Sequence, residues 1–405
     1  DAHTAWANHN MLQVLGVTAA AVAAMPKQNR EYFRVDAKGE PTGFATEAGA
    51  SQLFKALPGR DGTYDPDWGR RAVQYYNERG VTAVLEANAG HPPDDGETVL
   101  RVYKELSEQG RLTLHVSALL QAETFGDLGK IYELRRKYSG LRNFAIVGVK
   151  MFADGILEYP AQTAAVNHPY SNSGKRGVLK IAPEVMDAIA VDADRHGMIV
   201  HVHAIGDRAV HEALDAIAAA RRANPGSHLP HTIAHLQLID PADIPRFGQL
   251  QAVASFQLLW AAADAGEVKL VKPYIDPAGY ALQYPARSVS ASGGTVAGGS
   301  DWPVTSGNPW EAIAQAMTRE GPYGVLNGSE RLTLPVLLRA YTINAAKALC
   351  LESRIGSIEV GKEADLVLLP RDITQLQPRE IAAVRPVWTR VHGALVTPAA
   401  RDSKS

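Results

Sequence analysis

Residues 198–212 read Met-Ile-Val-His-Val-His-Ala-Ile-Gly-Asp-Arg-Ala-Val-His-Glu, and the rest of the chain can be interpreted around them. The first five residues are apolar and partly β-branched, which predicts a buried strand. His201 and His203 lie two positions apart near its end and therefore share one face. A helix is expected over 208–222, with Asp207 as its N-cap.

The composition is that of an ordinary globular protein. The chain has 405 residues, of which 46% are hydrophobic and 21% charged, enough to bury a large core. A formal net charge of −2 gives no support for a nucleic-acid or membrane partner, and no apolar run reaches the length that spans a bilayer. Because Cys350 is the only cysteine, an intrachain disulfide and a cysteine-only zinc site are excluded.

The N-terminal sequence says little about the compartment. The apolar run 19–25 is short and lacks a basic flank, so it predicts a helix and not a signal peptide. A cytoplasmic location is favoured, but the first residue is not Met and the compartment stays open.

Strands and helices alternate through the middle of the chain. The apolar runs predict seven strands, which are centred on Val84, Val116, Val149, Val200, Ile233, Val253 and Val296. This alternation is typical of an α/β fold with a parallel sheet. We favour a TIM-type (β/α)8 barrel over an open doubly wound sheet, because polar residues end several different strands. A barrel of this kind has eight strands, so the first strand is unaccounted for.

The C-terminal region has a different character. Short strands separated by Gly and Pro are expected over 355–360, 364–369 and 387–396. We therefore divide the chain into a barrel domain over 1–352, incomplete at its N-terminus, and a small C-terminal β-sandwich portion over 353–405.

Side chains that can bind a metal end four of the predicted strands, namely Lys150, His203, His235 and Asp301. Imidazole and carboxylate ligands at converging strand ends suit a catalytic divalent ion with an open position. One such residue alone is more often structural, and a lysine in an apolar strand can simply extend to solvent. Four in order, each on a separate strand, favour the metal-site hypothesis.

Several motifs resemble the metal-dependent amidohydrolase superfamily and, more narrowly, its amidohydrolase-3 group, which includes N-substituted formamide deformylase-like proteins. They are Val-His-Ala-Ile-Gly-Asp-Arg-Ala-Val (202–210), Ile-Ala-His-Leu-Gln (233–237), Gly-Gly-Ser-Asp-Trp-Pro-Val (298–304) and the tail segment 356–369. The resemblance extends over essentially the whole chain.

The resemblance implies a function and a role for each residue. His203 and His235 would be metal ligands, and Asp301 both a ligand and the general base. Lys150 would bridge two ions if it is carboxylated. The implied cofactor is one or two divalent ions, with zinc favoured. The implied activity is hydrolysis of a non-peptide C–N bond in a small amide, formamide or cyclic amide by metal-bound hydroxide.

The chain departs from the family in one large respect. The family places a His-x-His pair on the first strand, whereas the only such pair here, His201 and His203, falls in the fifth-strand position. The chain is then a fragment, or a homo-oligomer or second polypeptide supplies the first strand, or the protein is degenerate. The alternative function is therefore a catalytically inactive remnant or scaffold.

Other residues receive weaker assignments. His168, Trp302 and Glu86 are candidates for substrate binding, against the alternatives of a solvated loop, aromatic core and an ion pair. Asp154 is expected either to orient Lys150 or to form a turn. We interpret a further set of histidines as surface residues, namely His91, His196, His211, His228 and His392.

Overall fold

The computed structural model describes residues 3–55, 57, 66–91 and 97–397. The chain separates into two compact units, one made of residues 1–64 with 159–162 and the other of residues 65–158 with 163–405. The boundary expected between residues 352 and 353 stays a prediction. No helix in these described ranges combines the length and apolar character that crossing a membrane requires.

The first unit contains a small antiparallel sheet in the order β1-β3-β2. Its strands and helices are β1 Thr4–Trp6, α1 His9–Val14, α2 Ala19–Ala24, α3 Lys27–Arg30, β2 Phe33–Val35, β3 Pro41–Thr46 and α4 Glu47–Lys55. Apolar side chains from each part of the unit form its core, among them Leu12, Val22, Phe33 and Leu53.

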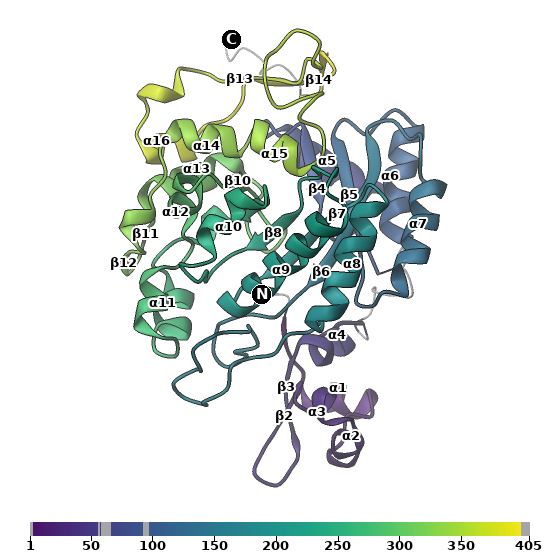
Figure 1. Cartoon of the computed structure of the whole chain (residues 1–405), viewed down its shortest axis with the longest axis vertical. Helices are drawn as coiled ribbons and strands as arrows, with labels where there is room; N and C mark the ends of the chain where they lie inside the picture. Colours follow the sequence, from purple (N-terminus) through teal and green to yellow (C-terminus); the bar gives the residue numbers. More distant parts are fainter. Residues whose placement is uncertain (1–2, 56, 58–65, 92–96, 398–405) are drawn as a thin grey trace. The chain divides into compact units, whose positions relative to one another are not determined.

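The second unit is built on a seven-stranded parallel sheet in the order β10-β9-β8-β7-β6-β5-β4 (Figure 1). Its strands are β4 Ala83–Glu86, β5 His115–Gln121, β6 Phe144–Phe152, β7 Ile199–Ala204, β8 Thr232–His235, β9 Val253–Phe256 and β10 Thr295–Gly298. All seven predicted strands are confirmed, and each pairs with its neighbour in sequence. The curled parallel sheet confirms the predicted α/β barrel class.

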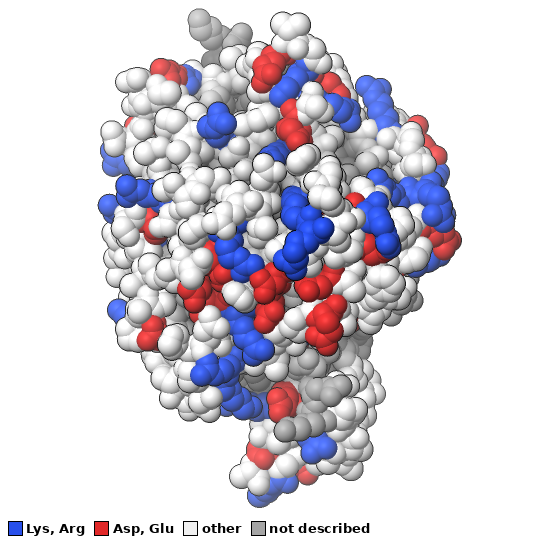
Figure 2. All heavy atoms as spheres, in the orientation of Figure 1, with Lys and Arg blue, Asp and Glu red and all other residues white. Residues whose placement is uncertain are grey.

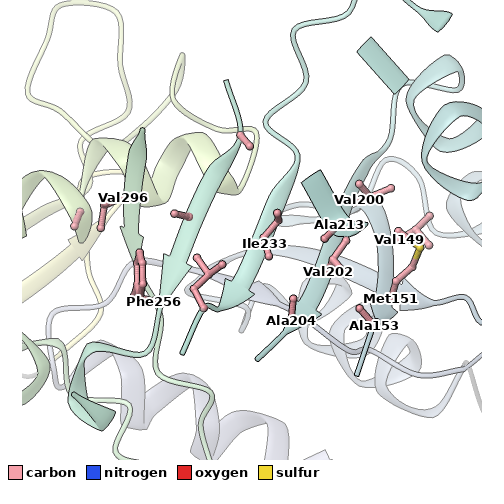
Figure 3. Close-up of a cluster of buried hydrophobic side chains, with 14 of the residues drawn as sticks. Val149, Met151, Ala153, Val200, Val202, Ala204, Ala213, Ile233, Phe256 and Val296 are labelled. Atoms are coloured by element: carbon pink, nitrogen blue, oxygen red, sulfur yellow. The ribbon is translucent and has the colours of Figure 1, made fainter. Parts of the chain in front are cut away.

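Several of the helices that connect and follow these strands cover the outer face of the sheet. The helices of this unit are α5 Pro66–Asn77, α6 Thr98–Glu108, α7 Asp127–Lys137, α8 Pro183–Arg195, α9 Asp207–Ala223, α10 Ile244–Gln249, α11 Pro277–Ala281, α12 Ala286–Ala291, α13 Pro309–Thr318, α14 Leu334–Ala340, α15 Ile343–Ala348 and α16 Pro378–Ala382. Strand side chains alternate between the two faces, so Val200 and Val202 pack outward in the main core, near Ala213 of α9 (Figure 3). Burying each valine contributes roughly 1.5–3 kcal/mol. The residues between and after them, His201 and His203, therefore face inward.

The inner face is apolar at the N-terminal end of the strands. Val253, Ala297 and Leu349 form a buried cluster there. Ser117 of β5 donates a hydrogen bond from Oγ to the Leu349 carbonyl oxygen at 2.8 Å. The segment after α15 thus fills this end of the sheet, and the polar residues gather at the opposite, C-terminal end.

A three-stranded antiparallel sheet follows, with β13 Leu366–Leu368, β14 Trp388–Val391 and β15 Ala394–Leu395. His392 and Gly393 have φ of 51° and 78°, as a two-residue type I′ turn requires, so one expected strand is a hairpin. The strand expected over 355–360 is wrong. This segment consists mostly of bends and irregular structure, and no described segment pairs with it.

Charged side chains are spread over the surface. On the face drawn in Figure 2, basic and acidic groups are interspersed, and neither sign forms a continuous field. This distribution agrees with the formal net charge of −2.

Candidate metal centre

The C-terminal ends of β6 and β7 bring Lys150 and two histidines onto the inner face. Lys150 is the register partner of His201, and Phe152 is the partner of His203. Lys150 Nζ lies 3.3 Å from His201 Nδ1. All three ionisable side chains are buried, so their interactions are only weakly screened by water.

The side chain of His235 points to the same inner cluster because the regular strand conformation ends at this residue. Its register partner is Ala204, whose side chain belongs to the main core on the outer face. His235 has a φ of 78°, which interrupts the alternation and turns its ring inward. The ring lies 4.4 Å from that of His203, at 62°, and stacks on Trp260 at 5.4 Å.

The orientation of His203 is set by the loop after β6. Its Nε2 lies 3.0 Å from the Gly155 carbonyl oxygen, which can only accept, so Nε2 carries the hydrogen. Nδ1 then bears the lone pair of the ring, through which a histidine binds a metal ion. A carbonyl that holds the far nitrogen in this way is a common feature of metal-bound histidines.

Asp154 anchors the same loop. It accepts hydrogen bonds from the backbone N–H groups of Ala165, Ile205 and Gly206 at 2.9–3.0 Å. Its Oδ1 also lies 3.5 Å from His203 Nε2. Burial raises the pKa of Asp154 to about 7, although the three backbone donors oppose the rise. Asp154 therefore orients His203, and no contact with Lys150 supports the role expected for it.

Burial dominates the electrostatics of the inner cluster. It lowers the pKa of Lys150 to about 7, while the charge of Asp301 acts in the opposite direction. It also lowers the pKa of His201 well below its usual value, with smaller contributions from Lys150 and His235. His201 is thus neutral near pH 7, and a large part of Lys150 is an uncharged amine.

Asp301 follows β10 and has a φ of 53°, in the left-handed region that non-glycine residues seldom adopt. Its effect on the pKa of Lys150 places it within electrostatic reach of the cluster. The next residue, Trp302, is 40% exposed. The Trp302 ring stacks on that of Tyr75 at 5.5 Å and meets that of Tyr76 at 5.7 Å.

The structure does not bring Glu86 and His168 to this cluster. Glu86 pairs with Ala118, which faces the outer core, and accepts a hydrogen bond from Tyr103 Oη at 2.9 Å. Burial raises the pKa of this carboxyl. His168 is exposed in the long loop after β6, and its charge acts on Asp207. Their substrate-binding roles stay predictions.

The N-cap prediction for α9 is wrong by one position. Gly206 is the N-cap, and Asp207 is the first helical residue. The Asp207 carboxylate accepts from the backbone N–H groups of Asn167 and Arg208, so it also ties the long loop to the helix.

The donors at the inner cluster fit one divalent ion. His203 and His235 present imidazoles from neighbouring strands, and the uncharged amine of Lys150 is the form that carboxylation requires. Among the described residues, no His, Cys or carboxylate atom completes a three-ligand group with these two imidazoles. A carboxylated Lys150 would supply the third ligand.

Sequence reasoning did not predict several contacts within this cluster. The contact between His201 and Lys150 depends on the register of β6 against β7, which no local pattern reveals. Trp260 lies in a predicted insertion, and only the left-handed backbone conformation of His235 brings its ring against that of Trp260. The one signal in the sequence was the two-residue spacing of His201 and His203, which places both side chains on the same face of the strand.

The comparisons with known proteins agree with this architecture. The chain is 29% identical over 386 residues to the protein LONG AFTER FAR-RED 3 of Arabidopsis thaliana, covering 91% of this chain and 63% of the plant protein. It is 26% identical to N-substituted formamide deformylase of Arthrobacter pascens, covering 97% of this chain and 71% of that enzyme. The chain therefore spans less than two thirds of the plant protein's length.

A solved structure has the same fold. An uncharacterized metal-dependent hydrolase from Pyrococcus horikoshii OT3 superposes with a TM-score of 0.72 at 25% identity, covering 93% of this chain and 71% of that one. The family model described as "Amidohydrolase family" matches residues 1–397. The chain therefore belongs to the amidohydrolase family, as its motifs predicted.

Proposed function

We propose that the protein is a metal-dependent hydrolase of a non-peptide C–N bond in a small amide, formamide or cyclic amide. The observation that carries the proposal is the convergence of His203, His235 and Lys150 at the C-terminal ends of three neighbouring strands. Barrel folds place their chemistry at this end. The similarity to N-substituted formamide deformylase supports the substrate class.

His203 and His235 would hold the ion, which we propose to be zinc. A carboxylated Lys150 would add an anionic oxygen and could join a second ion. A divalent ion held there polarises a carbonyl oxygen and lowers the pKa of a water molecule to about 7. The Gly155 carbonyl keeps the proton of His203 on Nε2, so Nδ1 is the nitrogen that would bind the ion.

Asp301 is the proton carrier in this proposal. Its carboxylate takes a proton from the attacking water and delivers one to the departing nitrogen. The carbonyl carbon gains a C–O bond and loses its C–N bond, so one water molecule is consumed. Trp302, half-exposed beside Asp301, offers an apolar face to the substrate. His168 and Glu86 have other surroundings and receive no role in this proposal.

The test is Asp301→Asn, assayed against a panel of small formamides, amides and cyclic amides with metal content measured alongside. We expect kcat to fall by a factor on the order of 10² to 10⁴ while metal remains bound. Asp372→Asn is the matched control, because Asp372 is exposed and caps a distant turn, and Asn caps equally well. Wild-type kcat in Asp301→Asn would refute the proton-transfer role.

One observation favours the inactive-scaffold alternative. Among the described residues, His203 and His235 form no three-ligand group with another His, Cys or carboxylate atom, and Lys150 needs modification to act as a ligand. The two functions differ in metal binding at this site. An enzyme loses the zinc of this site and its activity together in His203→Asn/His235→Asn, whereas a scaffold holds no zinc at this site and has no activity before the change.

A further inference from the structure

A second group of ionisable residues lies at the other end of the parallel sheet. His115 is the first residue of β5, whereas Gln121, the last, pairs with Lys150. Six residue steps of a strand span about 20 Å, which separates this group from the inner cluster. Glu363 and Asp365 precede β13, and His392 lies in the turn between β14 and β15.

Three of these side chains, those of His115, Glu363 and His392, converge on one point, and Asp365 lies against His115. His115 Nε2 lies 3.0 Å from Asp365 Oδ2 and 3.5 Å from Glu363 Oε2. His392 Nδ1 lies 2.6 Å from Glu363 Oε2, and the two imidazole rings are 4.7 Å apart. One ligand atom each from His115, Glu363 and His392 fall within 4.8 Å of one another.

The atoms at the centre of this group contact one another, but these contacts are not aligned as hydrogen bonds. His115 Nε2, Glu363 Oε2 and Asp365 Oδ2 are all shielded from solvent, and they meet as ion-pair contacts. The side chains of His115 and Asp365 are only 2% and 4% exposed. Buried polar atoms are nearly always satisfied, so three that face one another without an aligned hydrogen bond suit a bound cation between them.

The atoms facing away from the centre are held by hydrogen bonds. Asn143 donates from Nδ2 to the Leu112 carbonyl oxygen at 2.9 Å, which turns its Oδ1 toward His392 Nε2. His392 Nε2 must then carry the hydrogen, and the Nδ1 lone pair faces Glu363. Asp365 Oδ1 accepts from the backbone N–H of His392, which leaves Oδ2 for the centre. This second layer of contacts is typical of metal ligands.

We propose that His115 Nε2, Glu363 Oε2, Asp365 Oδ2 and His392 Nδ1 bind one structural Zn²⁺ ion. Two imidazoles and two carboxylates give a four-coordinate site, the arrangement that zinc prefers. The hard cations Ca²⁺ and Mg²⁺ prefer all-oxygen surroundings, and the two imidazoles disfavour them. With all four positions filled by protein, the ion has no open position for catalysis and instead ties β5 to the C-terminal sheet.

This proposal differs from the sequence interpretation, which placed His392 at the surface. His392 is 24% exposed, and its turn directs the ring toward His115. His115 carried no signal in the sequence, because it is a single histidine at the start of a strand. Its partners lie about 250 to 280 positions further along the chain, beyond any local motif.

The test measures zinc binding to the full chain after chelator treatment, by equilibrium dialysis against Zn²⁺ and elemental analysis. The background variant is His203→Asn/His235→Asn, which removes the ligands of the inner cluster. We expect this variant to retain one equivalent of zinc. Adding His392→Asn, which creates an Asn-Gly pair suited to the type I′ turn, should weaken zinc binding at least 10-fold. Asp365→Asn should act similarly.

His228→Asn in the same background is the matched control, because His228 is exposed in a loop, and zinc binding should not change. If the background variant is unfolded by circular dichroism, the same comparison is made in the wild-type chain, where His392→Asn should remove one equivalent. The proposal is overturned if the folded background variant binds no zinc, or if His392→Asn and Asp365→Asn both bind it as tightly as their parent. Protons would then hold the four residues as an ion-pair network. Activity does not enter the measurement, so failure of the proposed function leaves this result unaffected.

Discussion

Replacing Lys150 by Met tests the physical state of the inner cluster directly. Lys150 is 3% exposed, and burial lowers the pKa of its amine to about 7 from an ordinary value of 10.5. Met has a similar length and carries no charge. At 1.36 kcal/mol per pH unit, the interval between the two values corresponds to at most roughly 5 kcal/mol of unfolding free energy.

The sign of the effect follows from proton binding. Between about pH 7 and 10.5 the unfolded chain binds more protons at Lys150 than the folded chain, so wild-type stability rises with pH. Lys150→Met lacks this dependence. We expect the variant to be more stable than wild type by up to roughly 5 kcal/mol near pH 7, and the difference to shrink by about 1.4 kcal/mol per pH unit above that.

The assay is urea unfolding of chelator-treated protein at pH 7, 8, 9 and 10 and constant ionic strength, followed by circular dichroism. Lys175→Met is the matched control, since Lys175 is exposed, and it should leave the pH profile of unfolding unchanged. A difference between Lys150→Met and wild type that is the same at every pH would refute the assignment of a buried, largely neutral amine.

Three further substitutions test the packing and a buried carboxyl group. Gly298→Ala should destabilise the protein by about 1–3 kcal/mol, because a Cβ there would overlap the ring of Tyr341. Gly129→Ala on α7 is the control, because its Cβ meets open space, and it should stabilise the protein by up to about 1 kcal/mol. Thermal unfolding of both variants and the wild type measures the two effects. Burial raises the pKa of Glu267 to about 8, so its contribution to stability is present below pH 4.5 and is lost as the pH rises through 8. Glu267→Gln keeps an acceptor for the hydroxyl of Tyr284. Its stability relative to wild type should rise between pH 5 and pH 8, by at most roughly 5 kcal/mol. The expectation is contradicted if the difference between the urea midpoints of variant and wild type is the same at pH 5 and pH 8.

Much of the fold could be predicted from local patterns. Each strand of the parallel sheet is a short apolar run followed by a helix, and this periodicity is set by neighbours in sequence. The prediction failed where a segment needed a distant partner. The run 355–360 has the composition of a strand but no described segment to pair with, and 387–396 is divided by the turn at His392 and Gly393.

The residues of the candidate site could likewise be predicted where a local pattern marks them, but not where their position depends on a distant strand. His203, His235 and Lys150 stood out because each ends an apolar strand, and the structure places His203 against His235 and Lys150 against His201. Glu86 met the same criterion, yet its side chain faces the outer core and accepts from Tyr103. Being at the end of a strand does not determine which face a side chain occupies, since that depends on register.

The sequence by itself determined the family, the order of the strands and the pair of histidines in residues 198–212. These depend on residue types and spacings within single segments, and a local reading recovers them. Only the tertiary structure decided that Lys150 contacts His201, that the backbone break at His235 turns its ring toward His203, and that His115 meets His392. Such contacts join segments far apart in the chain, and strand register and side-chain packing set them.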